Sequence, residues 1–403
     1  MPDEQPTLLV TIVGKDRPGV TSALFTALSA HGVEVLDIEQ VVLRRRLVLG
    51  VLVTLPRDES SLRGALERVA GDLGMDVDIE RGRGDNRARR DGRSHVTVLG
   101  RPLRPSAVSA IAGRIADTGA NIDRIVRMAR YPVTAIELDV SGTQPHLLRT
   151  LLSPEAARQR VDIAVQPAGF LRHGRKLIVM DVDSTLVQGE VIEMLASHAG
   201  SAAQVAEITE RAMSGELDFA DSLRERVRTL AGLDAAALDT VYEALQLAPG
   251  ARTLVRTLKR LGYVFGIVSG GFSQITARIA ADLDIDYARA NELEIVDGRL
   301  TGRIVGPVVD RAGKADALRG FAADCGIALS HTVAIGDGAN DLDMLAAAGL
   351  GVAFNAKPVV RAAADTSLTV PYLDTICYLL GISREEIEAA DADAGFATPA
   401  PPL

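Results

Sequence analysis

The sequence predicts an α/β protein in which a doubly wound parallel sheet, carrying an inserted helical cap, follows two small α+β domains of the ferredoxin-like type. Three observations predict this fold class. The first part of the chain contains a repeat of about 85 residues. From about residue 176, apolar strands alternate with helix-spaced segments. Finally, about 65 residues separate the end of the first of these strands from Pro249, far more than a bare loop needs.

The repeat consists of two copies whose matching strings lie 84 to 87 residues apart. The strings that recur are 11–14 and 97–100, 31–38 and 118–125, and 77–79 and 161–163. Each copy reads strand, helix, strand, strand, helix, strand, which is the order of a ferredoxin-like domain. In copy one we expect strands at 8–13, 33–43, 47–55 and 77–80, and helices at 18–30 and 61–73.

The following segment predicts a Rossmann-like, doubly wound parallel sheet. Three short apolar runs, Leu177–Met180, Val264–Val268 and Val333–Ile335, are typical of buried strands, and a fourth strand is expected at Leu350–Phe354. Asp297-Gly298 lies between two alternating runs and predicts a hairpin turn. The long connection contains four helix-spaced segments, so we expect a helical cap inserted over the edge of the sheet. These segments are 191–198, 202–213, 219–230 and 235–247.

These patterns divide the chain into five parts. We expect the first ferredoxin-like domain at 1–82, a linker at 83–94, the second such domain at 95–170, the α/β domain at 171–388 with its cap at about 188–248, and a disordered tail at 389–403. The linker is rich in arginine, which would also suit an RNA-binding arm. A solvated linker is favoured because the run is short, is interrupted by Asp and Gly, and lacks aromatic residues.

Composition excludes several function classes. The formal net charge of −9 argues against a nucleic-acid-binding protein, and 3% aromatic residues with no Trp argue against stacking platforms for bases. The acidic, polar start is unlike a signal peptide, and no apolar run approaches the length of a membrane span. Two cysteines, Cys325 and Cys377, do not form a disulfide scaffold. We therefore expect a cytoplasmic protein without nucleic-acid or membrane partners.

Polar residues follow each of the three apolar strands at its carboxyl end. The strings are Asp181-Val182-Asp183-Ser184-Thr185, Ser269-Gly270-Gly271 and Gly336-Asp337-Gly338-Ala339-Asn340-Asp341. Any one of them alone is more often an ordinary turn than a site. In doubly wound sheets, however, ligands bind outside the carboxyl ends of the strands. Three polar strings at one edge therefore predict a functional site there.

The aspartates of these strings predict a divalent cation. Two carboxylates 4 Å apart repel each other by about 4 kcal/mol at an effective dielectric constant of about 20. Asp181, Asp183, Asp337 and Asp341 would therefore not all stay ionised together without a cation. An all-oxygen ligand set without a Cys/His cluster suits Mg²⁺ better than zinc. Lys314, which alone would be an ordinary solvated lysine at a helix start, could then help to hold a phosphate dianion.

Two aspartates two residues apart predict phosphoryl transfer through a covalent intermediate. One carboxylate would attack phosphorus. The other would give a proton to the leaving alkoxide and then take one from the hydrolytic water. The alternation of side chains along a strand would place Asp181 and Asp183 on the same side of the chain.

With these motifs the sequence resembles the haloacid dehalogenase-like phosphatases and, within them, the phosphoserine phosphatases. The three strings and Lys314 occur in the family's order, and Glu190–Glu193, Met213–Phe219 and Asn291–Leu293 also match the phosphoserine enzymes. The match covers about residues 176–380. The resemblance implies Mg²⁺-dependent hydrolysis of O-phospho-L-serine to L-serine and phosphate, the last step of serine biosynthesis, through an aspartyl-phosphate.

The resemblance also implies a role for each motif residue. Asp181 would be the nucleophile and Asp183 the general acid/base. Mg²⁺ would be held by Asp181, the Asp183 carbonyl and Asp337, with Asp341 in support. The phosphate would be held by Ser269, the Gly270 N–H, Lys314 and Asn340. In the cap, Glu190 would pair with the ammonium group of the substrate and Arg226 with its carboxylate. Met213 and Phe219 would form walls of the pocket. Residue chemistry alone does not single out Arg226 from Arg224 and Arg228, and Met213 and Phe219 could equally be cap core.

The two repeats resemble ACT domains, small amino-acid-sensing modules that associate edge to edge. Copy one carries Gly14-Lys15-Asp16-Arg17-Pro18-Gly19-Val20, close to the family's effector loop. Copy two lacks the Asp and the Pro-Gly-Val after Gly100, although Asn121 fits the pattern. The resemblance implies L-serine as an effector, with Gly14, Asp16, Gly100 and Asn121 as candidate contacts, and a homodimer formed through the ACT domains.

Two alternatives remain open. The same chemistry could act on another substrate, such as phosphothreonine or a sugar phosphate. The chain could also be a non-catalytic amino-acid sensor on an inactive scaffold, but an inactive scaffold need not keep the acid pair, Lys314 and Asp337. A cap must open and close over its site, and we expect its hinges at Gln188-Gly189 and 248–250.

Overall fold

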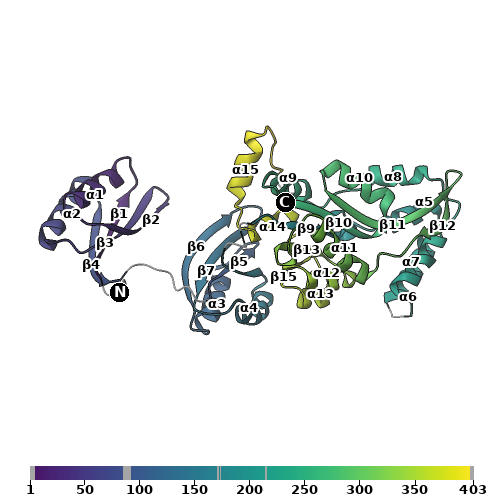
Figure 1. Cartoon of the computed structure of the whole chain (residues 1–403), viewed down its shortest axis with the longest axis horizontal. Coiled ribbons are helices and arrows are strands. Elements are labelled where there is room, and N and C mark those ends of the chain that lie inside the picture. The colour runs from purple at the N-terminus through teal and green to yellow at the C-terminus, as the bar shows by residue number, and fades with distance from the viewer. Residues whose placement is uncertain (1–4, 85–91, 170–171, 173, 214–215, 400–403) are drawn as a thin grey trace. The chain divides into compact units, whose positions relative to one another are not determined.

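The computed structural model describes residues 5–84, 92–169, 172, 174–213 and 216–399. The chain forms two compact units, residues 1–90 and 91–403 (Figure 1). The first unit is one ferredoxin-like domain, and the second contains another such domain together with the α/β domain. Among the residues described, no helix is both long and apolar enough to cross a membrane.

The first unit is a four-stranded antiparallel sheet with two helices on one face. Its elements are β1 (Pro6–Lys15), α1 (Val20–Ser29), β2 (Val35–Leu43), β3 (Arg46–Thr54), α2 (Glu59–Leu73) and β4 (Asp76–Arg83), with strand order β2-β3-β1-β4. Alternate residues of β1, Leu8, Val10 and Ile12, are fully buried in a core shared with α1 and α2. This confirms the predicted ferredoxin-like pattern.

The second copy repeats this topology within the second unit. Its elements are β5 (Ser94–Gly100), α3 (Pro105–Ala116), β6 (Asn121–Ala129), β7 (Thr134–Ser141), α4 (Pro145–Gln159) and β8 (Asp162–Pro167), in the order β6-β7-β5-β8. Strand register makes Val13 equivalent to Leu99 and Asp76 equivalent to Asp162, an offset of 86 in both strands. The predicted echo of 77–79 in 161–163 is therefore out of step by two residues, a shift that keeps the same face of the strand.

The α/β domain has a seven-stranded sheet in the order β12-β11-β10-β9-β13-β14-β15. The strands are β9 (Leu177–Met180), β10 (Val264–Phe272), β11 (Tyr287–Val296), β12 (Arg299–Val305), β13 (Thr332–Gly336), β14 (Leu350–Phe354) and β15 (Thr366–Leu368), and the helices packed with them are α9 (Ala251–Arg260), α10 (Ser273–Leu283), α11 (Arg311–Asp324), α12 (Leu342–Ala347), α13 (Pro358–Ala363) and α14 (Ile376–Leu379). All neighbouring pairs are parallel except β11 with β12, which form the predicted hairpin at Asp297-Gly298. The chain proceeds from β9 to β10 on one side and later to β13 on the other, so the strand order reverses beside β9.

The predicted cap is present between β9 and α9. It consists of α5 (Val191–Ala199), α6 (Ala202–Met213), α7 (Phe219–Arg228) and α8 (Ala236–Ala244) (Figure 1). Its two connecting segments run side by side, since Val187 and Leu247 form an antiparallel bridge. The hairpin β11–β12 also contacts the cap through the Gly232 N–H, which donates to the Leu300 carbonyl at 2.8 Å. The hinge positions remain a prediction.

The second ferredoxin-like copy packs against the α/β domain within one continuous core. Leu99, Ala129, Ala135 and Ala164 belong to the same buried cluster as residues of the α/β domain such as Tyr372, Leu373 and Leu379. Polar contacts extend this interface: the Asp162 carboxylate accepts hydrogen bonds from the Thr369 N–H and hydroxyl, and Arg149 pairs with Asp365 at 2.5 Å, while Arg172 pairs with Glu137 between the two parts of the chain.

The predicted disorder of residues 389–403 is wrong for residues 389–399. Helix α15 spans Arg384–Asp393, and the fully buried Asp391 carboxylate accepts hydrogen bonds from Arg256 and Arg260. Burial would raise the pKa of Asp391, but these hydrogen bonds outweigh it and lower the pKa to about 2. Residues 400–403, like 85–91 of the predicted linker, lie outside the described residues. Arg83 and Ser94 belong to β4 and β5 rather than to the linker.

Candidate active site

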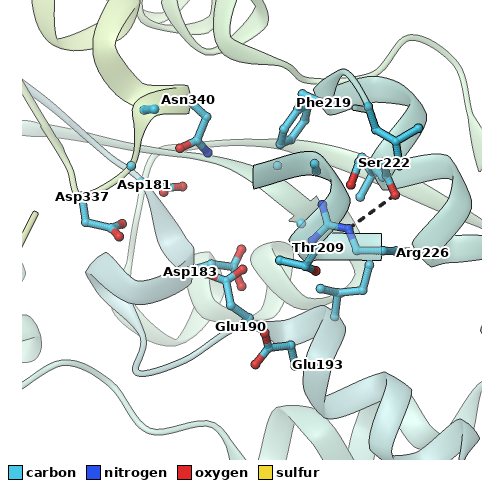
Figure 2. A pocket seen from close by; sticks show the side chains of 18 of the residues that line it. Asp181, Asp183, Glu190, Glu193, Thr209, Phe219, Ser222, Arg226, Asp337 and Asn340 are labelled. Carbon is cyan, nitrogen blue, oxygen red and sulfur yellow. Dashed lines mark hydrogen bonds between the residues drawn. The ribbon is translucent and has the colours of Figure 1, made fainter. Parts of the chain in front are cut away.

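A cavity of about 490 Å³ lies at the carboxyl ends of β9, β10 and β13, between the sheet and the cap. The sheet contributes Asp181, Asp183, Gly270, Asp337 and Asn340, and the cap contributes Glu190, Phe219 and Arg226. Figure 2 shows the aspartates gathered on one side of the cavity and Arg226 on the cap side. Most of the site residues predicted from the sequence thus come together in one place, at the reversal of strand order where ligands are expected.

Asp181 is the first residue after β9 and is fixed by a buried lysine. The Lys314 ammonium lies 2.7 Å from Asp181 Oδ1 and 2.7 Å from Asp341 Oδ1, and all three residues are buried. Burial, together with the charge of Asp341, raises the pKa of Asp181. Burial alone would lower the pKa of Lys314, but the two carboxylates raise it, so the lysine stays charged.

Asp183 is held by two donors at once. Its Oδ1 accepts from the Val191 N–H at 2.9 Å and its Oδ2 from the Ser269 hydroxyl at 2.9 Å. The Gly271 N–H donates to Ser269 Oγ at 2.7 Å, and a Cβ on Gly271 would lie only 2.9 Å from Asp183 Oδ2. Ser269 and Lys314 are therefore placed behind the two aspartates and are not part of the cavity lining.

Asp181 and Asp183 both line the cavity, but the predicted alternation of side chains along a strand does not explain this. Strand β9 ends at Met180, and the following backbone turns, with Ser184 in the left-handed region at a φ of 59°. The hydrogen bonds to Asp183 described above, rather than strand alternation, therefore orient its side chain.

Three carboxylates form a group that could hold a metal ion. One oxygen each of Asp181, Asp337 and Asp341 lies within 4.8 Å of the others. Asp337 Oδ1 also accepts from the Thr185 hydroxyl at 3.0 Å, and burial followed by the charge of Asp341 raises the pKa of Asp337. A raised pKa on neighbouring buried carboxylates means that their joint ionisation is unfavourable without a cation. An oxygen-only donor set fits a hard divalent cation.

The cap side of the cavity carries an acidic side chain, Glu190, and a basic one, Arg226. Glu190 accepts from the Ser184 hydroxyl at 3.1 Å, and burial, with the nearby charge of Asp183, raises the pKa of Glu190 to about 7. Burial also lowers the pKa of Arg226, whose Nε donates to the Ser222 carbonyl at 3.4 Å. Of the cap arginines considered above, Arg226 lines the cavity, whereas Arg224 and Arg228 do not.

Phe219 and Gly270 form the wall between cap and sheet. A Cβ added to Gly270 would lie 2.8 Å from Phe219 Cζ, so the ring rests directly on the glycine. Asn291 supports this loop from behind: its amide donates to the Gly270 carbonyl and its Oδ1 accepts from the Val309 N–H, both at 2.7 Å. The side chain of Met213, at the end of α6, lies outside the described part of the chain.

Sequence reasoning missed several residues that line the cavity. Glu193, Thr209, Ser222 and Lys357 are among them. Lys357 follows β14, so the rule that polar residues follow each strand could have found it. Glu193 lies three residues after Glu190, a spacing that places both near the same face where α5 begins. Thr209 and Ser222 carried no signal, because a cap helix has polar residues on its solvent face as well.

None of the four candidate effector residues is among the described residues that line this cavity. Two of them are glycines with close neighbours: a Cβ on Gly14 would lie 2.6 Å from Met75 Cγ, and one on Gly100 would lie 2.8 Å from Leu103 Cα. The Asp16 N–H donates to the Arg45 carbonyl at 2.7 Å, and Asn121 Nδ2 donates to Asp123 Oδ1 at 2.9 Å.

The fold and the acidic site together define a haloacid dehalogenase-like hydrolase. The family model for the haloacid dehalogenase-like hydrolases matches residues 178–346, and two ACT domain models match residues 6–80 and 93–166. The class of the catalytic part and the nature of the two repeats agree with the resemblance seen in the sequence.

Relatives that match nearly the whole chain narrow this class. The chain is 61% identical over 388 residues to the phosphoserine phosphatase of Streptomyces coelicolor, with 96% of this chain and 95% of that protein covered. It is 55% identical over 391 residues to phosphoserine phosphatase SerB2 of Mycobacterium tuberculosis, with 96% of both covered. The crystal structure of a probable phosphoserine phosphatase from Vibrio cholerae, in unliganded form, is similar with a TM-score of 0.58 and 35% identity, covering 76% of this chain and 90% of that one. The chain belongs to the phosphoserine phosphatase family, in the form that carries two ACT domains.

Proposed function

We propose that this protein hydrolyses O-phospho-L-serine to L-serine and phosphate, with Mg²⁺ as cofactor. The observation that carries the proposal is a single cavity in which paired aspartates, one of them held from behind by the buried Lys314, face the cap residues Glu190 and Arg226. Phosphoserine has a phosphate at one end and an amino-acid zwitterion at the other, so its charges match the two ends of this cavity.

The aspartates supply the covalent chemistry. A carboxylate oxygen of Asp181 attacks phosphorus, the bond from phosphorus to the serine oxygen breaks, and protonated Asp183 gives its proton to that oxygen. Water then attacks the phosphorus of the aspartyl-phosphate, Asp183 takes a proton from the water, and the bond from phosphorus to Asp181 breaks. Hydrogen bonds to both oxygens of Asp183 keep its carboxyl group in position for both proton transfers.

Positive charge is needed because both the nucleophile and the phosphate are anions. Lys314, buried against Asp181, and the Gly270 N–H lie where they can stabilise the charge of the transferring group. Asn340 lines the same end of the cavity. Mg²⁺, held by Asp181, the Asp183 carbonyl and Asp337 with Asp341 in support, would offset the charge on the phosphate oxygens.

The cap recognises the amino-acid part. The planar guanidinium of Arg226 can bind a carboxylate with two parallel hydrogen bonds, and ionised Glu190 can pair with the ammonium group. Because burial and the charge of Asp183 raise the pKa of Glu190 to about 7, binding of an ammonium group would favour its ionised form. A sugar phosphate offers neither group, so it should be a poor substrate.

The ACT domains suggest control by an amino acid. We assign this role to L-serine, the reaction product, acting as a feedback effector, and assign dimer formation to the same domains. The support is the effector-like loop of the first copy, which includes Gly14 and Asp16.

Phosphate release by the purified full-length chain tests the proposal. With Mg²⁺ the wild type should hydrolyse phosphoserine, should be slower on phosphothreonine and should leave sugar phosphates nearly untouched; EDTA should abolish turnover and added Mg²⁺ restore it. Asp181→Asn should lose about a thousandfold or more in kcat. Asp343→Asn alters a half-buried aspartate of α12 that pairs with Arg311 of α11; it is the matched control and should keep full activity. Full activity of Asp181→Asn would disprove the mechanism.

A further inference from the structure

One acidic side chain of the active-site cavity takes no part in the proposed reaction. Glu193 belongs to the cap helix α5, lines the cavity together with Glu190 and Arg226, and is exposed to solvent. A residue that lines a cavity and is also exposed lies at the opening of that cavity. Figure 2 shows Glu193 next to Glu190 on the cap side, away from Asp337 and Asn340. Glu193 is therefore at the end of the cavity that would receive the amino-acid part of a substrate.

An acidic residue in the first turn of a helix often has only a structural role. Glu193 is the third residue of α5, where a glutamate can accept a hydrogen bond from the N–H of the residue before the helix, here Glu190. The Glu193 carboxylate does not form this bond, and among the residues that the structure describes it has no hydrogen-bond or ion-pair partner. The carboxylate can therefore interact with a ligand without breaking a contact within the protein.

Glu193 is close enough to both neighbours to act on their charges. Burial lowers the pKa of Arg226, whereas the charges of Glu190 and Glu193 oppose this shift. Burial, together with the charges of Asp183 and Glu193, raises the pKa of Glu190. Within the described part of the chain, neither glutamate forms an ion pair with Arg226. Two acidic groups thus face one basic group across the cavity, which leaves negative charge that a cationic group of a ligand would offset.

We propose that Glu193 is a second binding residue for the ammonium group of the substrate, and that with Glu190 it determines the preference for a phosphorylated amino acid. This inference rests on the proposed function, because it takes phosphoserine as the substrate. An ammonium group has three N–H donors, so it can bind two carboxylates at once. With the substrate carboxylate on Arg226, both charges of the zwitterion are then paired. A neutral hydroxyl in place of the ammonium group gains no such attraction.

Three ligands that differ in one group each test the proposal on the full-length chain with Mg²⁺. O-Phospho-L-serine has a phosphate, an ammonium and a carboxylate group. The corresponding phosphorylated L-glycerate has a hydroxyl in place of the ammonium group, and O-phosphoethanolamine lacks the carboxylate. Initial rates with phosphoserine give kcat and KM, and the other two compounds are measured as competitive inhibitors of this reaction.

The variants are Glu193→Gln, Glu193→Asp and the control Glu207→Gln, which removes an exposed carboxylate of the cap helix α6 that does not line the cavity. Glu193→Gln should raise KM for phosphoserine about threefold to tenfold, as for an ionic hydrogen bond partly in water. It should leave kcat nearly unchanged, because the ammonium group is bound equally before and during the reaction. Inhibition by phosphoethanolamine should weaken by a similar factor, and inhibition by the glycerate should not weaken. Glu193→Asp should lie between Glu193→Gln and the wild type, and Glu207→Gln should equal the wild type.

Other patterns overturn the proposal. If Glu193 only positions Arg226, Glu193→Gln should weaken phosphoserine and the glycerate equally and leave phosphoethanolamine unchanged, because only the first two have a carboxylate. If Glu193 only stabilises the start of α5, the variant should melt at a lower temperature and bind all three ligands alike or equally less well. Normal turnover by the wild type together with either pattern overturns this inference alone. If the wild type does not hydrolyse phosphoserine, the proposed function fails and this inference fails with it.

Discussion

The two ferredoxin-like copies have the same topology, but the same sheet position is exposed in one and buried in the other. In the first copy, Val13 pairs with Val48, and Val48 with Val41; Val41 and Val48 are 47% and 41% exposed. The equivalent row of the second copy is Leu99, Ala135 and Ala129, each no more than 1% exposed because the α/β domain covers it.

Side-chain size follows this difference. Two exposed valines in the first copy correspond to two alanines in the second, where small side chains let another domain approach the backbone closely. The outer strand residue Asp76 is exposed in the first copy, whereas its equivalent Asp162 is buried and accepts two hydrogen bonds from Thr369. The same fold thus forms a separate unit in the first copy, whereas in the second copy it packs against the catalytic domain.

The two copies also differ in the loop that resembles the ACT effector loop. The first copy, which forms its own unit, keeps the Asp16-Arg17-Pro18-Gly19-Val20 string, and the second, which is packed into the catalytic unit, has lost it. We infer that the first copy is the sensor and the second mainly supports the catalytic domain.

Truncation should separate the two copies most strongly. Removal of residues 1–90 should leave phosphate release and the melting temperature of the catalytic unit nearly unchanged, because no core of that unit is cut. Removal of residues 1–168 exposes the apolar surface that covered Leu99 and Ala135, and should lower the melting temperature by about 10 °C or more, or cause aggregation. Calorimetry and activity measure both. Similar losses in the two truncations would contradict the comparison.

Exchange of the equivalent side chains should have the next largest effect. Ala135→Val inserts two methyl groups into a fully buried position and should cost about 1–3 kcal/mol of unfolding free energy in the second unit. Val48→Ala, at the equivalent exposed position, should change stability by less than about 1 kcal/mol. Urea unfolding of the full chain measures both. A larger loss for Val48→Ala would show that the exposed face is covered in the protein as it exists.

Replacement of the equivalent aspartates, Asp162 and Asp76, should change the free energy of unfolding by a smaller amount, and the difference should depend on pH. Asp162→Asn should cost about 1 kcal/mol at pH 4 through its bonds to Thr369, whereas Asp76→Asn should be within about 0.5 kcal/mol of the wild type. Burial raises the pKa of Asp162, although the Thr369 bonds oppose it. The folded state therefore binds the Asp162 proton more strongly than the unfolded chain, in which the pKa of an aspartate is about 3.9. As a result, the free energy of unfolding falls as the pH rises through the pKa of Asp162 in the folded state.

The amide that replaces the carboxyl group in Asp162→Asn cannot titrate, so the stability deficit of this variant should shrink as the pH rises above the unfolded pKa of about 3.9. Unfolding free energies measured at several pH values check this. A deficit that grows with pH would mean that the carboxylate is stabilised rather than penalised by its surroundings.

The smallest effect is expected on feedback. Asp16→Ala in the first copy should weaken inhibition by L-serine about fivefold, roughly the free energy of one hydrogen bond, while Asn121→Ala in the second copy should leave it unchanged. Initial rates at increasing L-serine measure this, with kcat in the absence of serine as the control. Equal shifts in both variants would mean that both copies sense the amino acid.

The sequence by itself determined the local and periodic features. Strand and helix periodicity, the 85-residue repeat and the Asp297-Gly298 turn predicted the fold class, because each depends on neighbours in sequence. The candidate catalytic residues could also be predicted from the sequence. Because the carboxyl ends of parallel strands meet at one edge of the sheet, Asp181, Asp183 and Asp337 had to lie close together once the strands were recognised.

Only the tertiary structure decided which surfaces meet. It placed Ser269 and Lys314 behind the aspartates, brought Lys357 into the cavity, selected Arg226 from three cap arginines, and paired Asp391 with Arg256 and Arg260 in a segment expected to be disordered. It also buried one ferredoxin-like copy and left the other exposed. Such outcomes depend on contacts between residues far apart in the chain, whose side-chain burial and charge pairing leave no periodic signal in the sequence.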